Sequence, residues 1–396
     1  MKIALHLISG ILLLAVASVL FSETSSAQKH VPSKPYLVYV GTYTNKTASK
    51  GIYAYSFDPG VGKLTSLGVA AESEDPSFVA VHPNGKYLYA VNETGNFGGQ
   101  KSGAVSAFSI DPKNGKLTLL NQLATQGAGP CHVSLDKTGK FVFVANYDGG
   151  SIAVFPVRED GSLAPASAFI QHSGSSIDKE RQEGPHAHWI ASTPDNRFVL
   201  AADLGLDEIL VYRFNAAKGT LAPNTPPFVK LEPGAGPRHL AFHPNGKFAY
   251  ALTEMGDSVT TFTYKAGNGS LTPLETVSAL SALRKDHVGV KEAAEIAVHP
   301  TGKFLYASNR AGIDTISALS IDPAKGTIKR KNEYPTMGKT PRNFAIDPTG
   351  KFLLAANQES NNIVVFRINR TTGALTPANQ IAQVPAPVDI VFTKAN

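Results

Sequence analysis

Histidine, arginine and glutamate residues recur in a few short stretches where they could hold an anion or move a proton. The stretch EGPHAHWI places His186 and His188 two residues apart after a Gly-Pro, GPRH contains Arg238, LTE ends at Glu254 and SNR ends at Arg310. An imidazole or carboxylate can accept a proton from water, and a guanidinium group can stabilise an oxyanion. These residue types favour acid–base chemistry on a small anionic molecule, provided that the fold brings them together.

The elements that would position these residues follow from a repeat along the chain. Stretches such as RHLAFHPNGKFAYALTE and RNFAIDPTGKFLLAANQ share a short apolar strand, a tight turn and a second strand. An alternating third strand follows, and a G-x-L segment predicts a fourth. The turn recurs at roughly fifty-residue intervals, at Gly85, Gly139, Asn196, Gly246, Gly302 and Gly350. Four strands per unit without helical periodicity predict the blade of an all-β propeller.

Six full units are visible, and the two ends of the chain supply a seventh. PVDIVFTKA near the C-terminus is a lone first strand, whereas YLVYVGTYTNKTASKGIYAYSFD near the N-terminus has second and third strands without a first. Joining them closes the ring and leaves no open sheet edge. We therefore expect one seven-bladed β-propeller of four-stranded blades over residues 28–396.

The first residues form a segment of a different kind. Lys2 precedes an apolar run, and Ser25 and Ala27 follow it at the spacing of a cleavage site. This pattern predicts a signal peptide over residues 1–27, with an uncleaved membrane anchor as the alternative. We expect a periplasmic or secreted protein that has no membrane contact once the signal is removed.

Composition narrows the class of ligand. The formal net charge is +6, without a block of lysine and arginine, which argues against nucleic acid and fits a small anionic substrate. Cys131 is the only cysteine, so an intramolecular disulfide is impossible, and we expect a buried thiol there. We expect a monomer that needs no cofactor.

Propeller geometry sorts the polar residues by face. The first strand of each blade lines the channel, so its start and the end of the second strand lie on one face, and the connecting turn lies on the other. His82, His243 and His299 precede a proline in that turn, and we expect them to be structural. The residues expected to converge at the opposite mouth begin first strands (His132, His186, His188, Arg238, His239 and Arg342) or end second strands (Glu93, Tyr147, Asp148, Asp203, Glu254, Arg310 and Gln358). Such polar side chains are costly inside a channel unless they are paired or used, which predicts a binding pocket.

The pair His186 and His188 has two further interpretations. With His132 or His239 the pair could bind a structural metal, but the candidates are scattered and cysteine ligands are missing, so we expect no metal site. Alternatively the two rings could be buried and hydrogen-bonded without a role in chemistry.

These motifs together resemble the lactonase family of seven-bladed propellers, which includes one type of bacterial 6-phosphogluconolactonase and the fungal carboxy-muconate cyclising enzyme. The resemblance covers roughly Tyr36 to the C-terminus. It implies a site of one histidine (His186 or His188), Arg238, Glu254 and Arg310, with Glu254 or a histidine as base and Arg238 stabilising an oxyanion. Arg310 and Arg342 would hold the substrate anion, and we count His132, Asp203 and Gln358 as further substrate-binding candidates.

The resemblance implies hydrolysis of a sugar lactone, and two alternatives differ from it in class. The same residues could run a cyclising or ring-opening proton transfer, as in the muconate branch, or the chain could be an exported propeller that only binds a partner. A signal peptide also separates the protein from 6-phosphogluconolactone, a cytosolic compound, so an unphosphorylated or other anionic lactone is a plausible substrate.

Overall fold

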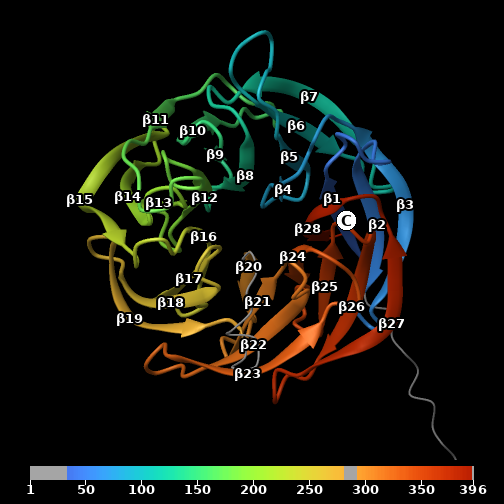
Figure 1. Ribbon diagram of the computed structural model, residues 1–396. Coiled ribbons are helices and arrows are strands. Elements are labelled where there is room, and N and C mark those ends of the chain that lie inside the picture. Colours follow the sequence, from blue (N-terminus) through green and yellow to red (C-terminus); the bar gives the residue numbers. More distant parts are fainter. Residues whose placement is uncertain (1–33, 281–291, 395–396) are drawn as a thin grey trace, which may run out of the picture. The chain divides into compact units, whose positions relative to one another are not determined.

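The computed structural model describes residues 34–280 and 292–394, and the regular structure within these ranges is entirely β. The strands form seven four-stranded antiparallel sheets, arranged as blades around a central channel (Figure 1). The predicted seven-bladed propeller is therefore confirmed. The expected signal peptide lies outside the described residues. Within them, no helix has the length and apolar character needed to cross a membrane.

Each blade runs from an inner to an outer strand. The inner strands are β4 (Val79–Val81), β8 (Pro130–Leu135), β12 (Ala187–Ser192), β16 (Pro237–Phe242), β20 (Ala293–Val298), β24 (Pro341–Ile346) and β28 (Pro387–Lys394). The second strands are β1 (Tyr36–Thr42), β5 (Tyr87–Asn92), β9 (Phe141–Asn146), β13 (Phe198–Asp203), β17 (Phe248–Thr253), β21 (Phe304–Asn309) and β25 (Phe352–Asn357). The third strands are β2 (Gly51–Asp58), β6 (Ala104–Ile110), β10 (Ser151–Pro156), β14 (Glu208–Asn215), β18 (Ser258–Lys265), β22 (Thr315–Ile321) and β26 (Asn362–Ile368). The outer strands are β3 (Lys63–Glu72), β7 (Leu117–Ala124), β11 (Ala168–Gln171), β15 (Thr220–Lys230), β19 (Ser270–Ser278), β23 (Ile328–Pro335) and β27 (Leu375–Gln383).

The ends of the chain close the ring as predicted. Strand β28 pairs antiparallel with β1, with Val40 opposite Ile390, and completes the blade β28-β1-β2-β3. Val40 and Ile390 also pack with the buried side chains of the neighbouring blade, among them Phe352. Pairing between distant segments thus removes the edge that β1 would otherwise expose.

The core lies between neighbouring blades and is built from repeated positions. An aromatic residue begins most second strands, and it packs under the glycine of the outer hairpin of an adjacent blade. Gly219, for example, has φ +68°, and a Cβ added there would lie 2.2 Å from Phe141 Cε1. Only glycine fits this left-handed position against the ring. The G-x-L glycines are therefore interblade contacts as well as turn residues.

The three turn histidines are structural, as predicted. His82 Nε2 lies 3.0 Å from the Gly139 carbonyl oxygen of the next blade, and His299 Nε2 lies 2.8 Å from that of Gly350. His243 Nε2 makes the same contact with Gly302 at 3.0 Å. Because each carbonyl can only accept, Nε2 of each ring carries the hydrogen. Each HP turn thus fastens its blade to the next one.

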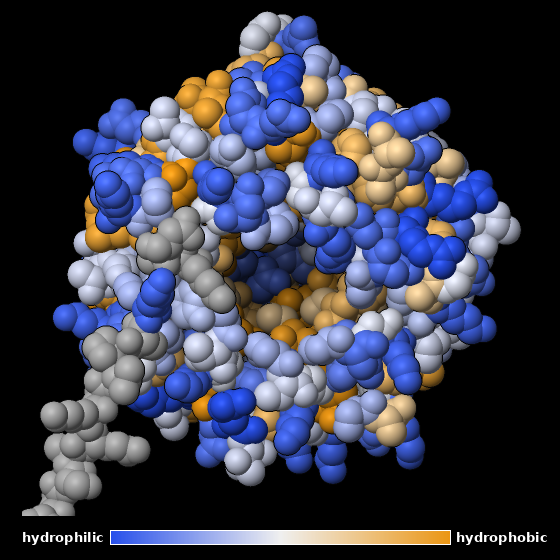
Figure 2. Space-filling model, turned by 180° about the vertical axis from the view of Figure 1, so that it is seen from behind, coloured by the Kyte–Doolittle hydropathy of each residue, from blue (hydrophilic) through white to orange (hydrophobic). Residues whose placement is uncertain are grey.

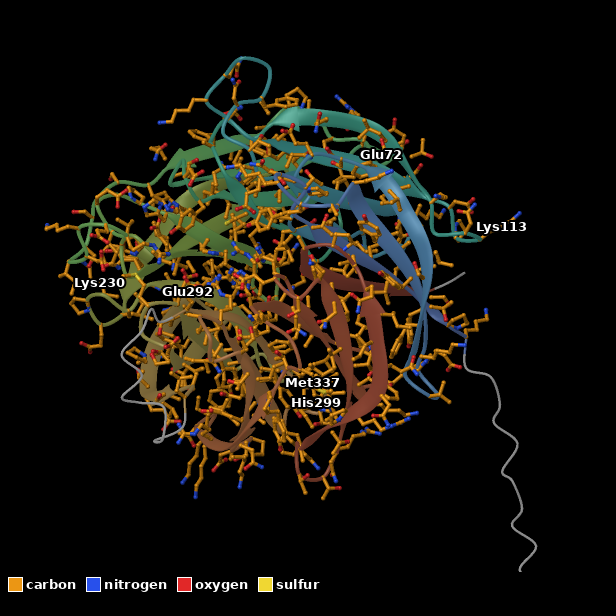
Figure 3. The ribbon with its side chains drawn as sticks, turned by 45° about the vertical axis from the view of Figure 1, so that its right-hand side comes forward. Glu72, Lys113, Lys230, Glu292, His299 and Met337 are labelled. Atoms are coloured by element: carbon orange, nitrogen blue, oxygen red, sulfur yellow. The ribbon has the colours of Figure 1, made fainter. Side chains whose placement is uncertain are left out.

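The channel widens into an apolar funnel on the side of these turns. Phe78, Trp189, Ile390 and Phe392 lie among the residues that line this hollow. Figure 2 shows a central opening with apolar residues on its wall and hydrophilic residues deeper inside. Charged side chains such as Lys113 and Lys230 lie at the periphery of the ring instead (Figure 3).

Candidate active site

Strand register delivers one side chain per blade to the mouth of the channel opposite the funnel. The first residue of an inner strand pairs with the last residue of the second strand, as in Pro237 with Thr253 and Ala293 with Asn309. The next residue of each second strand therefore reaches the mouth: Tyr43, Glu93, Tyr147, Leu204, Glu254, Arg310 and Gln358. In six blades the residue after the inner-strand start lies directly inside it: Cys131, His188, Arg238, Ala294, Arg342 and Val388. In the blade of β4, Ser77, two residues before the strand, contacts the mouth residue Glu93 instead.

Glu254 is the centre of the mouth cluster. Its Oε2 accepts hydrogen bonds from Arg238 Nε at 2.8 Å and from Arg310 Nη2 at 3.0 Å, and its Oε1 accepts one from Arg181 Nη2 at 2.7 Å. The predicted neighbourhood of Arg238 and Glu254 is confirmed, and Arg310 joins them. Three guanidinium groups share one buried carboxylate, so the cluster carries excess positive charge.

The electrostatics of the cluster keep Glu254 ionised. Burial alone would raise the pKa of Glu254, but Arg310 and Arg238 outweigh it and hold that pKa at about 2. Burial lowers the pKa of Arg310 to about 10, against the attraction of Glu254. A carboxylate with so low a pKa is a weak general base. Its arrangement suits it to holding arginines in place.

Arg238 has hydrogen-bond donors to spare. Of its five N–H groups, Nε–H is bound to Glu254, and Nη1 donates to the Ala294 carbonyl and lies 3.3 Å from His239 Nε2. Its Nη2 finds no partner among residues 34–280 and 292–394, although the side chain is buried. Two N–H donors on a fixed guanidinium group are what an oxyanion requires.

His186 lies at the rim, beside the arginine cluster. Its ring stacks on Tyr147, with centroids 4.5 Å apart, and Nδ1 lies 3.1 Å from the Tyr147 carbonyl oxygen. Because that oxygen can only accept, Nδ1 carries the hydrogen and Nε2 has a free lone pair. The Tyr147 hydroxyl accepts from Arg181 Nη2 at 3.1 Å, which links the imidazole to Glu254. Glu183 Oε1, 3.5 Å from Nε2, would stabilise an imidazolium.

His188 lies deeper than His186, and both rings contact Tyr147. His188 meets the tyrosine edge-on at 5.4 Å, and its Nδ1 lies 3.8 Å from Cys131 Sγ. Burial, with Arg238 next, lowers the pKa of His188 well below its usual range, so the ring is neutral. The Cys131 thiol is buried as expected. An enclosed cavity of about 10 Å³, room for about one water molecule, is lined by Cys131, His188, Arg238 and Arg342 among others.

A second polar group occupies the opposite side of the mouth. Arg342 lies over the Tyr43 ring, 5.2 Å from its centroid. The Tyr43 hydroxyl donates to Glu93 Oε1 at 2.9 Å, and Ser77 Oγ donates to Glu93 Oε2. Burial raises the pKa of Glu93, although Arg342 opposes the shift. No hydrogen bond of the Arg342 guanidinium is found within the described ranges, so its donors face the cavity unpaired.

Three of the residues predicted to bind substrate do not belong to the arginine cluster at the mouth. Asp203 has a fully buried side chain, and it accepts from His172 Nδ1 at 2.6 Å and from the backbone N–H of His186 at 2.8 Å. The carboxylate thus holds the start of β12 and does not open into the mouth. His132 packs inside the channel against Phe78, 4.6 Å between centroids. Gln358 reaches the mouth, but its Oε1 is buried without a partner among the described residues.

Arg181, like Tyr43 and Ser77, was not among the residues that the sequence predicted for the mouth. It belongs to the connection between β11 and β12, and its side chain is 36% exposed. The connection is held down by Gln182, which donates to the Leu204 carbonyl and to Asp207 Oδ1, and by Ser176, which donates to Asp207 Oδ2. The repeat positions strand residues only, so a loop arginine gives no periodic signal. Its position just before GPHAH was the available hint.

Among the described residues, no group of three or more histidine, cysteine, aspartate or glutamate side chains could hold a metal ion. The site is a basic mouth on a β-propeller, and its guanidinium groups can bind an anion through charge-assisted hydrogen bonds.

Comparison with known proteins identifies the family. Residues 37–392 match the model of the seven-bladed β-propeller lactonases, and the chain belongs to that family. It is 38% identical over 357 residues to a protein named 6-phosphogluconolactonase from Bacillus subtilis, covering 90% of this chain and 98% of that one. A second relative of that name, from Formosa agariphila, is 38% identical over 340 residues and covers 85% and 94%. The structure of a periplasmic gluconolactonase from Pseudomonas aeruginosa superposes with a TM-score of 0.85 at 35% identity, covering 91% of this chain and all of that one.

Proposed function

We propose that this protein is a hydrolase that opens a sugar lactone at the channel mouth. The observation that carries the proposal is the Glu254 cluster, where Arg238 is fixed at Nε and Nη1 and its Nη2 has no partner among the residues that the structure describes. A preorganised donor pair of this kind lowers the energy of a tetrahedral oxyanion. The names of the relatives, 6-phosphogluconolactonase and gluconolactonase, support the same reaction.

His186 acts as the base in this proposal. Its Nε2 lone pair removes a proton from water as the water oxygen attacks the lactone carbonyl carbon. The carbonyl π electrons move onto the oxygen, which Arg238 Nη2 and Arg310 stabilise. When the tetrahedral intermediate collapses, the bond from the carbonyl carbon to the ring oxygen breaks. The imidazolium returns its proton to that oxygen, and the product is an open-chain hydroxy acid.

Arg342 and Arg181 bind the anionic part of the substrate. The Arg342 guanidinium lies beside the cavity and has no hydrogen-bond partner in the described part of the chain, and Arg181 is the most exposed guanidinium of the cluster. Planar guanidinium groups bind carboxylate or phosphate with two parallel hydrogen bonds. Glu254 holds the arginines in place and takes no proton.

The test is hydrolysis of gluconolactone and 6-phosphogluconolactone by the purified protein, with the spontaneous rate subtracted. We expect Arg238→Ala and Glu254→Gln to lower kcat by roughly 10²–10³-fold, as for the loss of an oxyanion donor. The matched controls Arg370→Ala and Glu72→Gln change exposed residues and should retain wild-type rates. Full activity in both site variants would contradict the proposal. Absence of turnover on both lactones would favour the cyclising or binding alternatives.

Export is a separate part of the proposal. The apolar run and the small residues Ser25 and Ala27 support cleavage after Ala27, and a structural relative is described as periplasmic. Intact-mass measurement of the protein from cell fractions tests both where the protein resides and whether it has been cleaved. A protein in the periplasm or medium that begins at Gln28 is expected, and an uncleaved chain in the cytoplasm would contradict it. An exported enzyme would favour the unphosphorylated lactone.

A further inference from the structure

A chain of hydrogen bonds runs from Arg238 down into the channel. An arginine N–H can only donate, so His239 Nε2, 3.3 Å from Arg238 Nη1, must be an acceptor. The hydrogen of this imidazole is therefore on Nδ1, which donates to Glu295 Oε2 at 3.1 Å. Asn343 Nδ2 donates to the same oxygen at 2.6 Å. The direction of every bond in the chain is fixed by its end groups.

Glu295 is the last group in this series of hydrogen bonds, and one of its carboxylate oxygens has no further lone pair to accept another. Both lone pairs of Oε2 are taken by His239 and Asn343, and Oε1 accepts the backbone N–H of Ile296 at 2.8 Å. A carboxylate accepts such bonds roughly twice as strongly as a neutral group. Uptake of a proton would weaken the bonds to His239 and Asn343, and so the hold on Arg238.

From this geometry we propose that Glu295, acting through His239, is a positioning residue that fixes the Arg238 guanidinium for catalysis, and that proton uptake by Glu295 releases this restraint. The proposal rests on the proposed lactone hydrolysis. Of the three groups below Arg238, only His239 is among the residues that line the cavity beside Arg238. Glu295 is separated from that cavity by His239, so its effect on the reaction passes through His239 and Arg238.

The charged and ionisable groups around Glu295 are compatible with proton uptake by this carboxylate. Charged or ionisable neighbours of Glu295 are Arg238 and His239 on β16 and, more distantly, Asp389 on β28. Asn343 on β24 and Ser308 on β21 are neutral. Burial raises the pKa of Glu295 to about 7, which backbone Ile296 and then Arg238 oppose. Asp389 has a raised pKa from burial, so it adds little negative charge.

His239 itself stays neutral throughout. Rings of Phe78, His132 and His188 surround it at 5.2–5.7 Å between centroids. Burial and then Arg238 lower the pKa of His239 well below its usual range; Glu254 opposes the shift, and Arg342 and Arg310 add smaller decreases. The imidazole therefore transmits the state of Glu295 without taking up the proton.

The sign of the stability effect separates positioning from simple packing. A carboxyl group whose pKa is raised from 4.5 unfolded to about 7 folded stabilises the fold below pH 4.5, and this contribution is lost as the pH rises through 7. The amide introduced by Glu295→Gln does not ionise, so the variant does not lose this contribution as the pH rises. Relative to wild type, the variant should therefore gain in Tm between pH 5 and pH 8, while its kcat at pH 8 falls roughly tenfold or more.

The experiment records kcat against pH from 5 to 9, together with Tm, for wild type, Glu295→Gln, Asn343→Leu and the exposed control Glu72→Gln. We expect kcat to fall with decreasing pH in wild type and in the control, and this acidic limb to be shallower in Glu295→Gln, which lacks the ionisable carboxyl group. Asn343→Leu removes a hydrogen-bond donor to the Glu295 carboxylate. The part of the acidic limb that reflects proton uptake by Glu295 should therefore move to higher pH.

The outcomes remain distinct from those for lactone hydrolysis itself. If the wild type is active and both variants keep its acidic limb unchanged, the positioning role is overturned and the hydrolase proposal stands. The same conclusion follows if kcat and Tm of the variants fall in parallel at every pH. If wild type shows no turnover, gluconate binding by calorimetry replaces kcat. Binding should then weaken below pH 7 in wild type but less in Glu295→Gln, and equal pH dependence in the two proteins would overturn the inference.

Discussion

At the scale of single residues, the two histidines of the HAH motif lie in different surroundings. His186 has its tautomer fixed by the Tyr147 carbonyl and offers Nε2 at the rim, whereas His188 is buried beside Cys131. A base that is positioned and partly accessible suits proton transfer from water better than a ring enclosed under the arginines. The carboxylate of Glu254, bound by three guanidinium groups, is the least suited of the candidates.

We predict that His186→Asn lowers kcat by roughly 10²–10⁴-fold, because it removes general-base catalysis. His188→Asn keeps a polar group in the enclosed cavity and should lower kcat less than roughly tenfold, within the value of one neutral hydrogen bond. Steady-state kinetics on the best lactone measures both variants. The reverse order, with His188→Asn the more damaging, would make the buried ring the base.

The adjacency of Arg238 and Glu254 could be predicted because both residues occupy fixed positions in the repeat. The start of an inner strand and the end of the second strand of one blade must meet once the register is set. The environment of Asp203 could not be predicted in the same way. Its partner His172 comes from the connection after β11, and repeat position says nothing about which loop side chain will satisfy a carboxylate.

At the scale of elements, the connection between β11 and β12 adds Arg181 to a site otherwise made by strand ends. Arg181→Ala removes one charge-assisted hydrogen bond to Glu254 and one exposed cation. We expect a roughly tenfold rise in KM for a phosphorylated or carboxylated lactone, the equivalent of about 1.4 kcal/mol, and a smaller rise for a neutral one. Lys179→Ala, an exposed charge in the same connection, is the control. Equal effects on charged and neutral lactones would show that Arg181 has no part in anion selection.

The turns on the other face provide a stability prediction without a functional effect. His243→Ala leaves the Gly302 carbonyl without its partner and should cost about 1–3 kcal/mol in the free energy of unfolding. Because the turn lies on the far side of the channel, kcat should stay at the wild-type value. Chemical denaturation and steady-state kinetics on the same preparation test both parts. A loss of activity in the folded variant would mean that the turn acts on the mouth.

At the scale of the whole molecule, every blade contributes to the mouth through the same two positions, so the site exists only when the ring is closed. The sequence was sufficient to predict this closure, because a lone first strand at one end matched a missing first strand at the other. The site therefore depends on pairing between the first and last strands of the ring, in which Tyr36 lies opposite Lys394 and Val40 opposite Ile390.

Deletion of β28, from Pro387 to the C-terminus, should abolish cooperative folding. It exposes the edge of β1, removes the Asp389 oxygen that accepts the Val79 N–H at 2.9 Å, and opens the cluster that contains Ile390. We expect aggregation on size-exclusion chromatography and loss of the thermal transition. A circular permutant that links Lys394 to Lys34 and opens the chain at the exposed Gly98–Gly99 keeps the β28–β1 pairing and should fold and hydrolyse lactones normally. A soluble, active deletion variant would show that the ring does not need its closing strand, because the remaining blades would then hold the mouth residues in place by interblade packing alone.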